Sequence, residues 1–440
     1  YGAEIISIND QPAKNVRDTV EVLFGDSNPA TLECKRMNQD RLVGRAPVGK
    51  SMKIKFRNRG SADPVETTIV AVDDHYESFD KTTMGFVEPG PIVSYKILDP
   101  EKYGYLKMTD MGTDSASRAE HYQTFREAIT EFNNAGSRGM ILDLRVNRGG
   151  YDMLAAVLSG FFQTDTSLYE YNYLYDYDSH SFSINPYPVP HFKPANLGTY
   201  FNPNYPDGAL FIEPSGQTFS KPVMVLVSPR AVSSGEGLPM ILKRNPGNKI
   251  IGFHGTNGSF GILIGIPGID QYYFFPSRSD MYIRFPWALS ADKNLKVQID
   301  SDSTMTGGVT PNILIPMTDS IMDLMYVDSI DVELNRAIQE LNSLQGIGEN
   351  ATGSQDVILD QNYPNPAGEN TVITFCLKQP SDVSLTVQDL YGRRVQTLLS
   401  GFQKPGKHSV TWETKGLASG LYIYKLQAAG RIVSRKMILR

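Results

Sequence analysis

Cysteine is almost absent from this sequence of 440 residues, in which only Cys34 and Cys376 occur. Two cysteines so far apart, in segments assigned below to different domains, predict neither a structural disulfide nor a cysteine metal site. Their scarcity does not restrict the cellular compartment, because a large exported protein can be stabilised by the size of its core alone.

Long apolar runs and basic runs are missing as well. No run approaches the roughly 20 apolar residues of a membrane-spanning helix, so no transmembrane segment is predicted. No run of five Lys or Arg occurs and the net charge is -6, which disfavours nucleic acid as a partner. With 40% hydrophobic and 20% charged residues, the composition is typical of a globular protein, and the length predicts two to four domains.

The sequence also lacks an initiator Met and a histidine pattern suited to metal. It begins at Tyr1 with residues typical of the middle of a domain, so we expect a truncated N-terminus and a signal peptide upstream. We predict no metal and no cofactor, because five histidines show no metal-ligand spacing: His75, His121, His180, His191 and His408.

Residues 1–80 combine short strand-like runs with one helical stretch. The expected strands are Glu4–Pro12, Ala30–Arg36, Ser51–Phe56 and Glu66–Val72, and the expected helix is Val16–Leu23. This order resembles a PDZ domain without its first strand and binding loop, a domain type that binds peptide C-termini by strand addition. A generic small α/β module is the alternative. No binding residues can be transferred to this segment.

Residues 95–344 alternate strands and helices, the rhythm of an α/β core. The expected strands begin at Gly104, Gly139, Lys221 and Lys249, and hairpins are expected over Thr164–Phe219. The expected helices are one starting at Ser117-x-x-Glu120, then Met153–Phe162, Glu236–Arg244 and Asp319–Leu344.

The tail reads as a separate domain. A polar linker is predicted over 345–355, followed by an all-β sandwich over 356–440. Its expected strands are Val372–Leu377, Val383–Val387, His408–Trp412, Leu421–Leu426 and Arg435–Leu439.

Two segments of the α/β core could carry chemistry. In Asp143-Leu-Arg-Val-Asn-Arg-Gly-Gly150, a Gly pair after a strand can expose backbone N–H groups to an oxyanion, although it could equally form a simple turn. In Val227-Ser-Pro-Arg-Ala-Val-Ser-Ser-Gly-Glu236, small polar residues join a strand to a helix. Ser233 would then be a nucleophile at a helix N-terminus, or would only cap that helix.

Together these segments resemble the C-terminal processing (tail-specific, tricorn-related) serine peptidase family. Two more stretches match its pattern, Gly252-Phe-His-Gly-Thr-Asn-Gly258 and Gly308-Val-Thr-Pro-Asn312, the latter with Asn in place of Asp. The resemblance covers about 104–344 and implies a crotonase-like (ClpP-like) α/β spiral core. It implies Ser233 as nucleophile, with an oxyanion hole formed by the N–H groups of Ser234 and of Gly149 or Gly150.

The general base departs from the family pattern. Ser259 stands where one branch has its lysine, and Lys107 stands where the tricorn-like branch has its histidine. Met305 and Thr306 replace a supporting acidic residue of that branch. Lys107 would act as a base only if burial favours its neutral amine, and would otherwise be a solvated strand residue. His254 is the other candidate base, or else a hydrogen-bonded loop residue.

The tail resembles the C-terminal sorting domain of the type IX (Por) secretion system. The resemblance rests on four segments: Asn362–Pro366, Asp389–Arg393, Leu417–Tyr422 and Arg435–Arg440. It implies that the secretion machinery binds residues 356–440 and exports the protein outside, or onto the surface of, a Bacteroidetes-type bacterium. An ordinary β-sandwich adhesion module is the alternative.

These observations lead to three hypotheses about function. The first is a secreted serine endopeptidase that cleaves protein or peptide through an acyl-enzyme on Ser233. The second is an inactive protein with the peptidase fold that serves as an exported peptide-binding scaffold. The third is hydrolysis of another acyl substrate, because a fold alone does not determine function.

Overall fold

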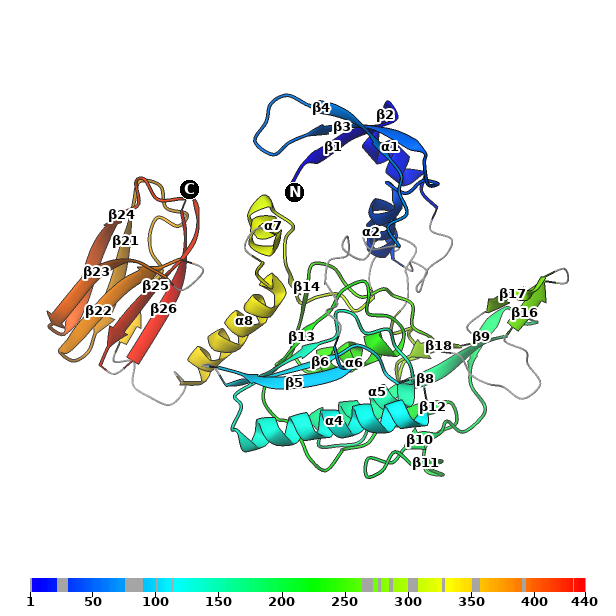
Figure 1. Ribbon diagram of the computed structural model, residues 1–440. Helices are drawn as coiled ribbons and strands as arrows, with labels where there is room; N and C mark the ends of the chain where they lie inside the picture. The colour runs from blue at the N-terminus through cyan, green and yellow to red at the C-terminus, as the bar shows by residue number, and fades with distance from the viewer. Residues whose placement is uncertain are drawn as a thin grey trace. The chain divides into compact units, whose positions relative to one another are not determined.

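The computed structural model forms two compact units, Tyr1–Leu341 and Asn342–Arg440, which we describe separately (Figure 1). It describes residues 2–21, 31–75, 90–99, 102–112, 114–176, 178–262, 272–275, 278–284, 288–299, 308–326, 329–349, 357–389, 393–429 and 431–439.

A six-stranded sheet forms the centre of the first unit. Its strand order is β19-β14-β13-β7-β6-β5, and every neighbouring pair is parallel except β5 with β6. The strands are β5 (Val93–Leu98), β6 (Tyr103–Met108), β7 (Met140–Asp143), β13 (Val223–Leu226), β14 (Lys249–Gly252) and β19 (Ile313–Leu314). β7 and β13 are buried throughout and apolar except for Asp143 at the end of β7, as expected for parallel strands covered on both faces.

Three helices pack with this sheet around one apolar core, which includes Leu106, Phe125, Leu142, Leu158 and Leu238. They are α4 (Ser115–Asn134), α5 (Asp152–Ser159) and α6 (Ser234–Lys243). The helix expected at Ser117 begins two residues earlier, because the Asp114 carboxylate accepts hydrogen bonds from the N–H groups of Ala116 and Ser117, both at 2.9 Å.

The end of the first unit contains two helices where one was predicted over 319–344. They are α7 (Asp319–Tyr326) and α8 (Val332–Glu349). α8 begins separately because the Asp331 carboxylate accepts the Leu334 N–H at 2.9 Å, which is the geometry of a helix N-cap. Residues 345–349, expected in a linker, belong to α8, and 350–356 lie outside the described residues.

The hairpins expected over 164–219 build a second sheet with the strand order β12-β8-β18-β15, to which β9 adds by pairing with β8. Its strands are β8 (Ser167–Asp176), β9 (Ser181–Ile184), β12 (Ala209–Ile212), β15 (Gly261–Ile262) and β18 (Ala288–Ala291). Two short antiparallel pairs lie outside this sheet. They are β10 (His191–Phe192) with β11 (Thr199–Tyr200) and β16 (Tyr272–Phe275) with β17 (Arg278–Arg284).

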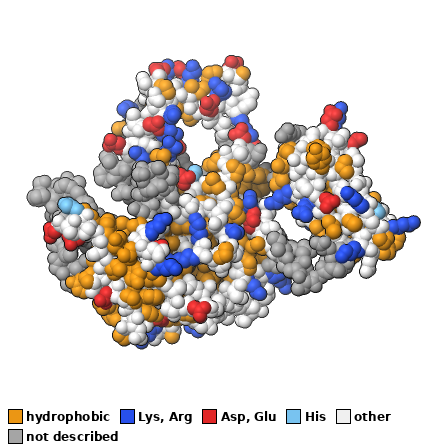
Figure 2. All heavy atoms as spheres, turned by 180° about the vertical axis from the view of Figure 1, so that it is seen from behind, with side chains coloured by type: hydrophobic (Ala, Val, Ile, Leu, Met, Phe, Trp, Pro, Cys, Tyr) orange, Lys and Arg blue, Asp and Glu red, His pale blue; other side chains and the backbone are white. Residues whose placement is uncertain are grey.

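The N-terminal segment forms an antiparallel sheet of order β2-β1-β3-β4 with two helices. Its elements are β1 (Glu4–Ile8), β2 (Gln11–Pro12), α1 (Ala13–Asp18), α2 (Leu32–Leu42), β3 (Ser51–Arg57) and β4 (Val65–Val70). Charged side chains of both signs are interspersed over this sheet (Figure 2), as in the ion pairs of Lys53 with Asp10 and Glu66.

The strand predicted at Ala30–Arg36 is wrong, because a helix begins there. The Thr31 hydroxyl oxygen accepts the Cys34 N–H at 3.1 Å and so caps α2. The sequence does contain a signal for this helix that the strand prediction overlooked, namely a threonine in the cap position followed by Glu33 in the first turn.

The second unit is a β-sandwich, as predicted for the tail. One sheet has the order β20-β21-β24 and the other β23-β22-β25-β26. The strands are β20 (Val357–Leu359), β21 (Asn370–Leu377), β22 (Ser381–Gln388), β23 (Arg394–Gln403), β24 (Gly406–Glu413), β25 (Gly420–Ala428) and β26 (Arg431–Leu439). Trp412, Phe375 and Tyr424 fill its core. All five expected strands are confirmed. β20 and β23 were not predicted, because β20 has only three residues and the side chains of β23 do not alternate between buried and exposed.

Candidate active site

The predicted site residues follow neighbouring strands of the central sheet. Lys107 lies near the end of β6, the pair Gly149–Gly150 follows β7, Ser233 follows β13 and His254 follows β14. Because these four strands are parallel, their carboxyl ends meet at one edge of the sheet, where open α/β sheets commonly bind ligands.

Ser233 occupies a strained turn between β13 and α6. Its backbone has φ 53° and ψ -132°, an unusual conformation for a residue with a side chain, and its N–H donates to the Glu236 carboxylate at 3.2 Å. The residue is partly exposed. A serine on a sharp, strained turn from strand to helix is the arrangement that presents a nucleophilic hydroxyl in several hydrolases.

The two glycines allow this turn to approach the loop after β7. Gly149 has φ +81°, and a Cβ there would lie 2.7 Å from both the Ser233 Cβ and the Val232 carbonyl oxygen. Gly150 has φ +147°, and a Cβ there would lie 2.7 Å from the Gly112 carbonyl oxygen. Both positions therefore require glycine, for conformation and for space.

Two backbone donors remain available beside Ser233. The Gly149 N–H donates to the Asn147 side-chain oxygen at 3.0 Å, so this amide already has an acceptor. Among the described residues, no group accepts a hydrogen bond from the N–H of Gly150 or of Ser234. These two amides are thus the ones that could bind an oxyanion.

Glu236 connects the serine turn to the loop after β14. Its buried carboxylate accepts the Gly258 N–H at 2.6 Å as well as the Ser233 N–H. Burial raises the pKa of Glu236 to about 7, although hydrogen bonds from Thr256 and from backbone amides oppose the shift. The sequence placed Glu236 in a motif but did not reveal this connecting role.

The two candidate bases differ in their surroundings. Lys107 is partly buried on β6 and lies in register with Asp143 of β7, so both side chains point to the same face of the sheet. His254 instead lies near α2, with its Nδ1 3.7 Å from the Glu33 carboxylate. A hydrogen bond from His254 lowers the pKa of Glu33. In the described part of the chain, no hydrogen bond joins either residue to the Ser233 hydroxyl.

Helix α2 holds the loop that contains His254. The Glu33 carboxylate accepts the Gly255 N–H at 3.3 Å, and the Asn257 amide donates to the Cys34 sulfur at 3.1 Å and to the Pro229 carbonyl at 3.2 Å. Burial raises the pKa of Cys34 to about 12, so this cysteine remains a thiol. The N-terminal segment thus contacts the loop after β14 and, through the Cys34 thiol, the Pro229 carbonyl in the segment that leads to Ser233, which the sequence did not indicate.

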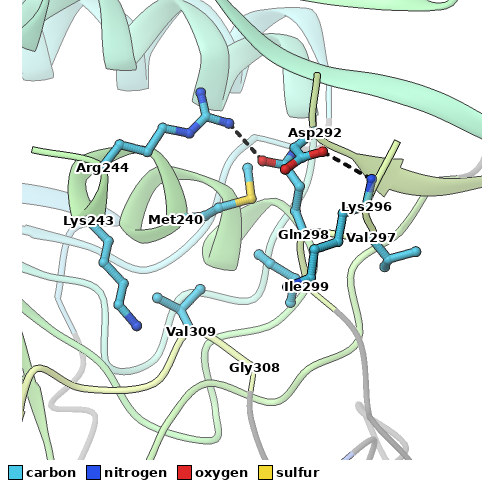
Figure 3. A pocket seen from close by; sticks show the side chains of 10 residues that line it. All are labelled: Met240, Lys243, Arg244, Asp292, Lys296, Val297, Gln298, Ile299, Gly308 and Val309. Carbon is cyan, nitrogen blue, oxygen red and sulfur yellow. Dashed lines mark hydrogen bonds between the residues drawn. The ribbon is translucent and has the colours of Figure 1, made fainter. Parts of the chain in front are cut away.

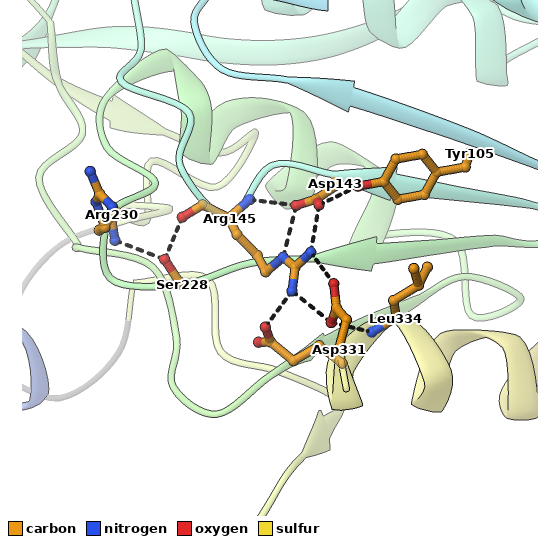
Figure 4. Close-up of polar contacts among 8 residues, drawn as sticks. Tyr105, Asp143, Arg145, Ser228, Arg230, Asp331 and Leu334 are labelled. Carbon is orange, nitrogen blue, oxygen red and sulfur yellow. Dashed lines mark hydrogen bonds and ion pairs between the residues drawn. The ribbon is translucent and has the colours of Figure 1, made fainter. Parts of the chain in front are cut away.

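A buried ion-pair network fixes the chain just before Gly149. The Arg145 guanidinium binds the carboxylates of Asp143 at 2.7 Å, Asp331 at 2.8 Å and Glu333 at 2.8 Å, and the Tyr105 hydroxyl donates to Asp143 at 2.7 Å (Figure 4). Burial would raise the pKa of Asp143, but Arg145 and Tyr105 outweigh it and lower the value. Burial raises the pKa of Glu333 to about 7.

The motif Gly308–Asn312 has a structural role. The Asn312 side-chain oxygen accepts the Ile250 N–H at 2.9 Å, which ties this segment to β14, and the Val309 N–H donates to the Thr256 hydroxyl at 2.6 Å. Met305 and Thr306 lie outside the described residues.

A pocket with a volume of about 330 Å³ lies beside the last turn of α6 (Figure 3). It lies away from Ser233, which precedes the first turn of that helix. Its main cation, Arg244, is already bound to the Leu168 and Tyr169 carbonyls and to Gln298. Among the described residues, no three His, Cys, Asp or Glu converge as metal ligands. No helix described here is long and apolar enough to cross a membrane.

Two family models match the sequence. Residues 102–272 match peptidase family S41, and residues 361–440 match a secretion system C-terminal sorting domain. Both resemblances drawn from the sequence are confirmed. The sorting domain indicates export by type IX secretion in Bacteroidetes, which gives a secreted or cell-surface location.

Several solved structures are similar to this chain at low sequence identity. A crystal structure of a CPAF mutant is 16% identical with a TM-score of 0.50, and the match covers 78% of each chain. CPAF complexed with lactacystin is 15% identical with a TM-score of 0.47, covering 79% of this chain and 77% of that one. The photosystem II D1 C-terminal processing protease is 13% identical with a TM-score of 0.32, covering 76% and 68%. No curated protein matches this chain.

Proposed function

Because residues 102–272 form a peptidase family S41 region in an exported chain, we propose that the protein is a secreted serine endopeptidase that acts through Ser233. Its substrate is an extended segment or C-terminus of a protein. Ser233 attacks the carbonyl carbon, the peptide C–N bond breaks, and the protonated amine fragment leaves behind an acyl-enzyme; water then hydrolyses the ester to release the acid product and free Ser233. The proposal includes the crotonase-like spiral for the core and a PDZ-like role in peptide binding for residues 1–80.

The backbone of Ser233 carries this proposal. Ser233 is the N-cap residue of α6 and forms a capping box with Glu236, but a serine that only caps a helix normally has an extended conformation, whereas Ser233 has φ 53° and packs against Gly149. Support also comes from the partial exposure of Ser233 and from the N–H groups of Gly150 and Ser234, which have no acceptor among the described residues. An oxyanion bound by both donors would be stabilised by several kcal/mol, since removing one such donor costs roughly 2.7–4 kcal/mol.

Of the two candidate bases, Lys107 fits better. His254 is held by Glu33 and α2, on the side of its loop that contacts the N-terminal segment. Lys107 lies on β6 at the same carboxyl edge as Ser233, and no hydrogen bond or ion pair engages its amine within the described residues. In the proposed mechanism, the Lys107 amine is the group that accepts the serine proton.

Cleavage of fluorescently labelled, unfolded casein by the full chain tests the proposal. Ser233→Ala should abolish cleavage, and Lys107→Met should lower it at least ~100-fold, the usual contribution of a general base. His254→Gln should retain most activity. Lys293→Met, which changes an exposed turn residue, is the matched control.

Each other outcome has a defined meaning. Cleavage that persists in Ser233→Ala refutes Ser233 as nucleophile. Loss of activity in His254→Gln with normal Lys107→Met identifies His254 as the base. A wild-type chain that binds unfolded casein but never cleaves it supports the alternative, an exported peptide-binding scaffold with the peptidase fold.

A further inference from the structure

A second polar network lies behind the proposed oxyanion hole. The Ser234 hydroxyl lies 2.6 Å from the Asp152 carboxylate and 3.1 Å from the Gly150 carbonyl oxygen. Asp152 is in the first turn of α5, which packs against α6 (Figure 1). The Ser234 side chain, which is completely buried, therefore joins the two segments whose amides face the reacting carbonyl in the proposed mechanism.

We infer that the Ser234 hydroxyl and the Asp152 carboxyl are a positioning pair that sets the spacing between the N–H groups of Ser234 and Gly150. This inference rests on the proposed function, because the spacing matters only if those amides bind an oxyanion. The pair contacts no substrate. It acts through the backbone on which the donors lie.

The proton inventory of the pair gives it two states. A serine hydroxyl has one hydrogen, so Ser234 can donate either to Asp152 or to the Gly150 carbonyl. When Asp152 is ionised it accepts that hydrogen, and the contact with Gly150 is lost. When Asp152 is neutral it donates to Ser234, and Ser234 donates to Gly150. Only the neutral state links all three groups in one chain of hydrogen bonds.

The surroundings of Asp152 favour its neutral state. Burial raises the pKa of Asp152 to about 6, while the bond from Ser234 lowers it. From β8, the buried side chains of Tyr169 and Glu170 face this region, and burial followed by the Asp152 charge raises the pKa of Glu170. Arg244, the residue that follows α6, faces Tyr169 and Glu170.

The histidines of neighbouring elements are engaged elsewhere. His121 of α4 has its Nδ1 3.4 Å from Asp110, and His191 of β10 lies 2.9 Å from both the Val189 carbonyl and the Phe211 N–H. Asp152, with Glu170 behind it, therefore determines the state of the pair.

Phosphonylation of Ser233 by a fluorophosphonate, in which fluoride leaves phosphorus, is measured as a second-order rate constant from pH 5 to pH 8 and tests this inference in the full chain. Asp152→Asn resembles the neutral acid, because its amide can donate to Ser234 at every pH. The ratio of its rate to that of the wild type should be near one at pH 5 and rise several-fold above pH 6. Ser234→Ala should lower the rate about tenfold or more at every pH, up to the ~10²–10³-fold of a lost donor.

Asp207→Asn, at an exposed loop position, is the matched control and should give a constant ratio near one. A ratio for Asp152→Asn that stays constant within twofold from pH 5 to pH 8 overturns the inference, even if the variant is slower, because a purely structural residue gives that result. A wild-type rate for Ser234→Ala also overturns it. If the fluorophosphonate does not modify the wild type at all, the proposed function fails, and the inference with it.

Discussion

Replacement of Arg145 by Met should destabilise the first unit strongly, since the side chain neutralises three carboxylates. Two of these are almost fully buried, Asp143 at 2% and Glu333 at 6% exposure. Arg145→Met keeps most of the apolar volume but leaves both charges without their partner. Breaking a buried pair in this way costs roughly 3–5 kcal/mol. Asp331 is more exposed, and its lost contact should add little.

The cost should depend on pH in a defined direction. In the wild type, the pKa of Glu333 is raised, so the folded chain binds this proton more readily than the unfolded chain. The contribution of Glu333 to the stability of the fold therefore decreases as pH rises through about 7. The lowered pKa of Asp143 adds stability that is lost on acidification. Without Arg145, the main opposition to burial is removed at both carboxyls, although Tyr105 still donates to Asp143. The destabilisation should therefore be largest above pH 7 and smaller near pH 5, where Glu333 is protonated.

Urea unfolding followed by circular dichroism at 222 nm measures this cost, because the described helices belong to the first unit except for the last part of α8. Arg336→Met is the matched control on α8, where a surface pair with Glu340 is worth about 0.3–0.5 kcal/mol. If Arg145→Met costs no more than Arg336→Met, or if its cost does not fall between pH 8 and pH 5, the reasoning is refuted.

Three further predictions concern the serine turn and its supports. Gly149→Ala should abolish cleavage of casein because its Cβ would meet Ser233. The control Gly49→Ala has a similar φ of +83° and nothing within 4 Å, so it should remain active and lose only about 1–2 kcal/mol of stability. Equal activities of the two variants would contradict this prediction. Glu236→Ala should lower cleavage at least ~10-fold by leaving the Ser233 and Gly258 amides without an acceptor, and a normal rate in a folded variant would exclude that role. Cys34 should react with iodoacetamide at pH 8 only after unfolding, as peptide mapping would show, because burial raises its pKa to about 12; rapid reaction of the native protein would show an exposed thiol.

The sequence predicted elements whose residues carry local signals. β7 and β13 are short apolar runs, α6 follows a cluster of small polar residues, and the sandwich strands alternate apolar and polar positions. Motif order placed Ser233, Gly149 and Gly150 on loops after parallel strands, and topology then brings those loops to one edge. This is why much of the candidate site could be predicted without a structure.

Long-range contacts could not be predicted in the same way. Nothing in Glu33 or Cys34 indicates that α2 contacts the loop of His254, since that contact joins residues more than 200 positions apart. The break between α7 and α8 depends on Asp331, which also binds Arg145 from another part of the chain. Asp152 reads as an ordinary first-turn residue, and only the packing of α5 on α6 places it against Ser234.

The central claim is that Ser233 is an activated nucleophile, and mapping the adduct of a fluorophosphonate by mass spectrometry tests it most directly. The account predicts one adduct per chain, on Ser233, that is absent from Ser233→Ala and retained by the Asp207→Asn control. An adduct on Ser234 or another residue, or an unmodified wild-type chain under conditions that label a known serine hydrolase, would contradict it.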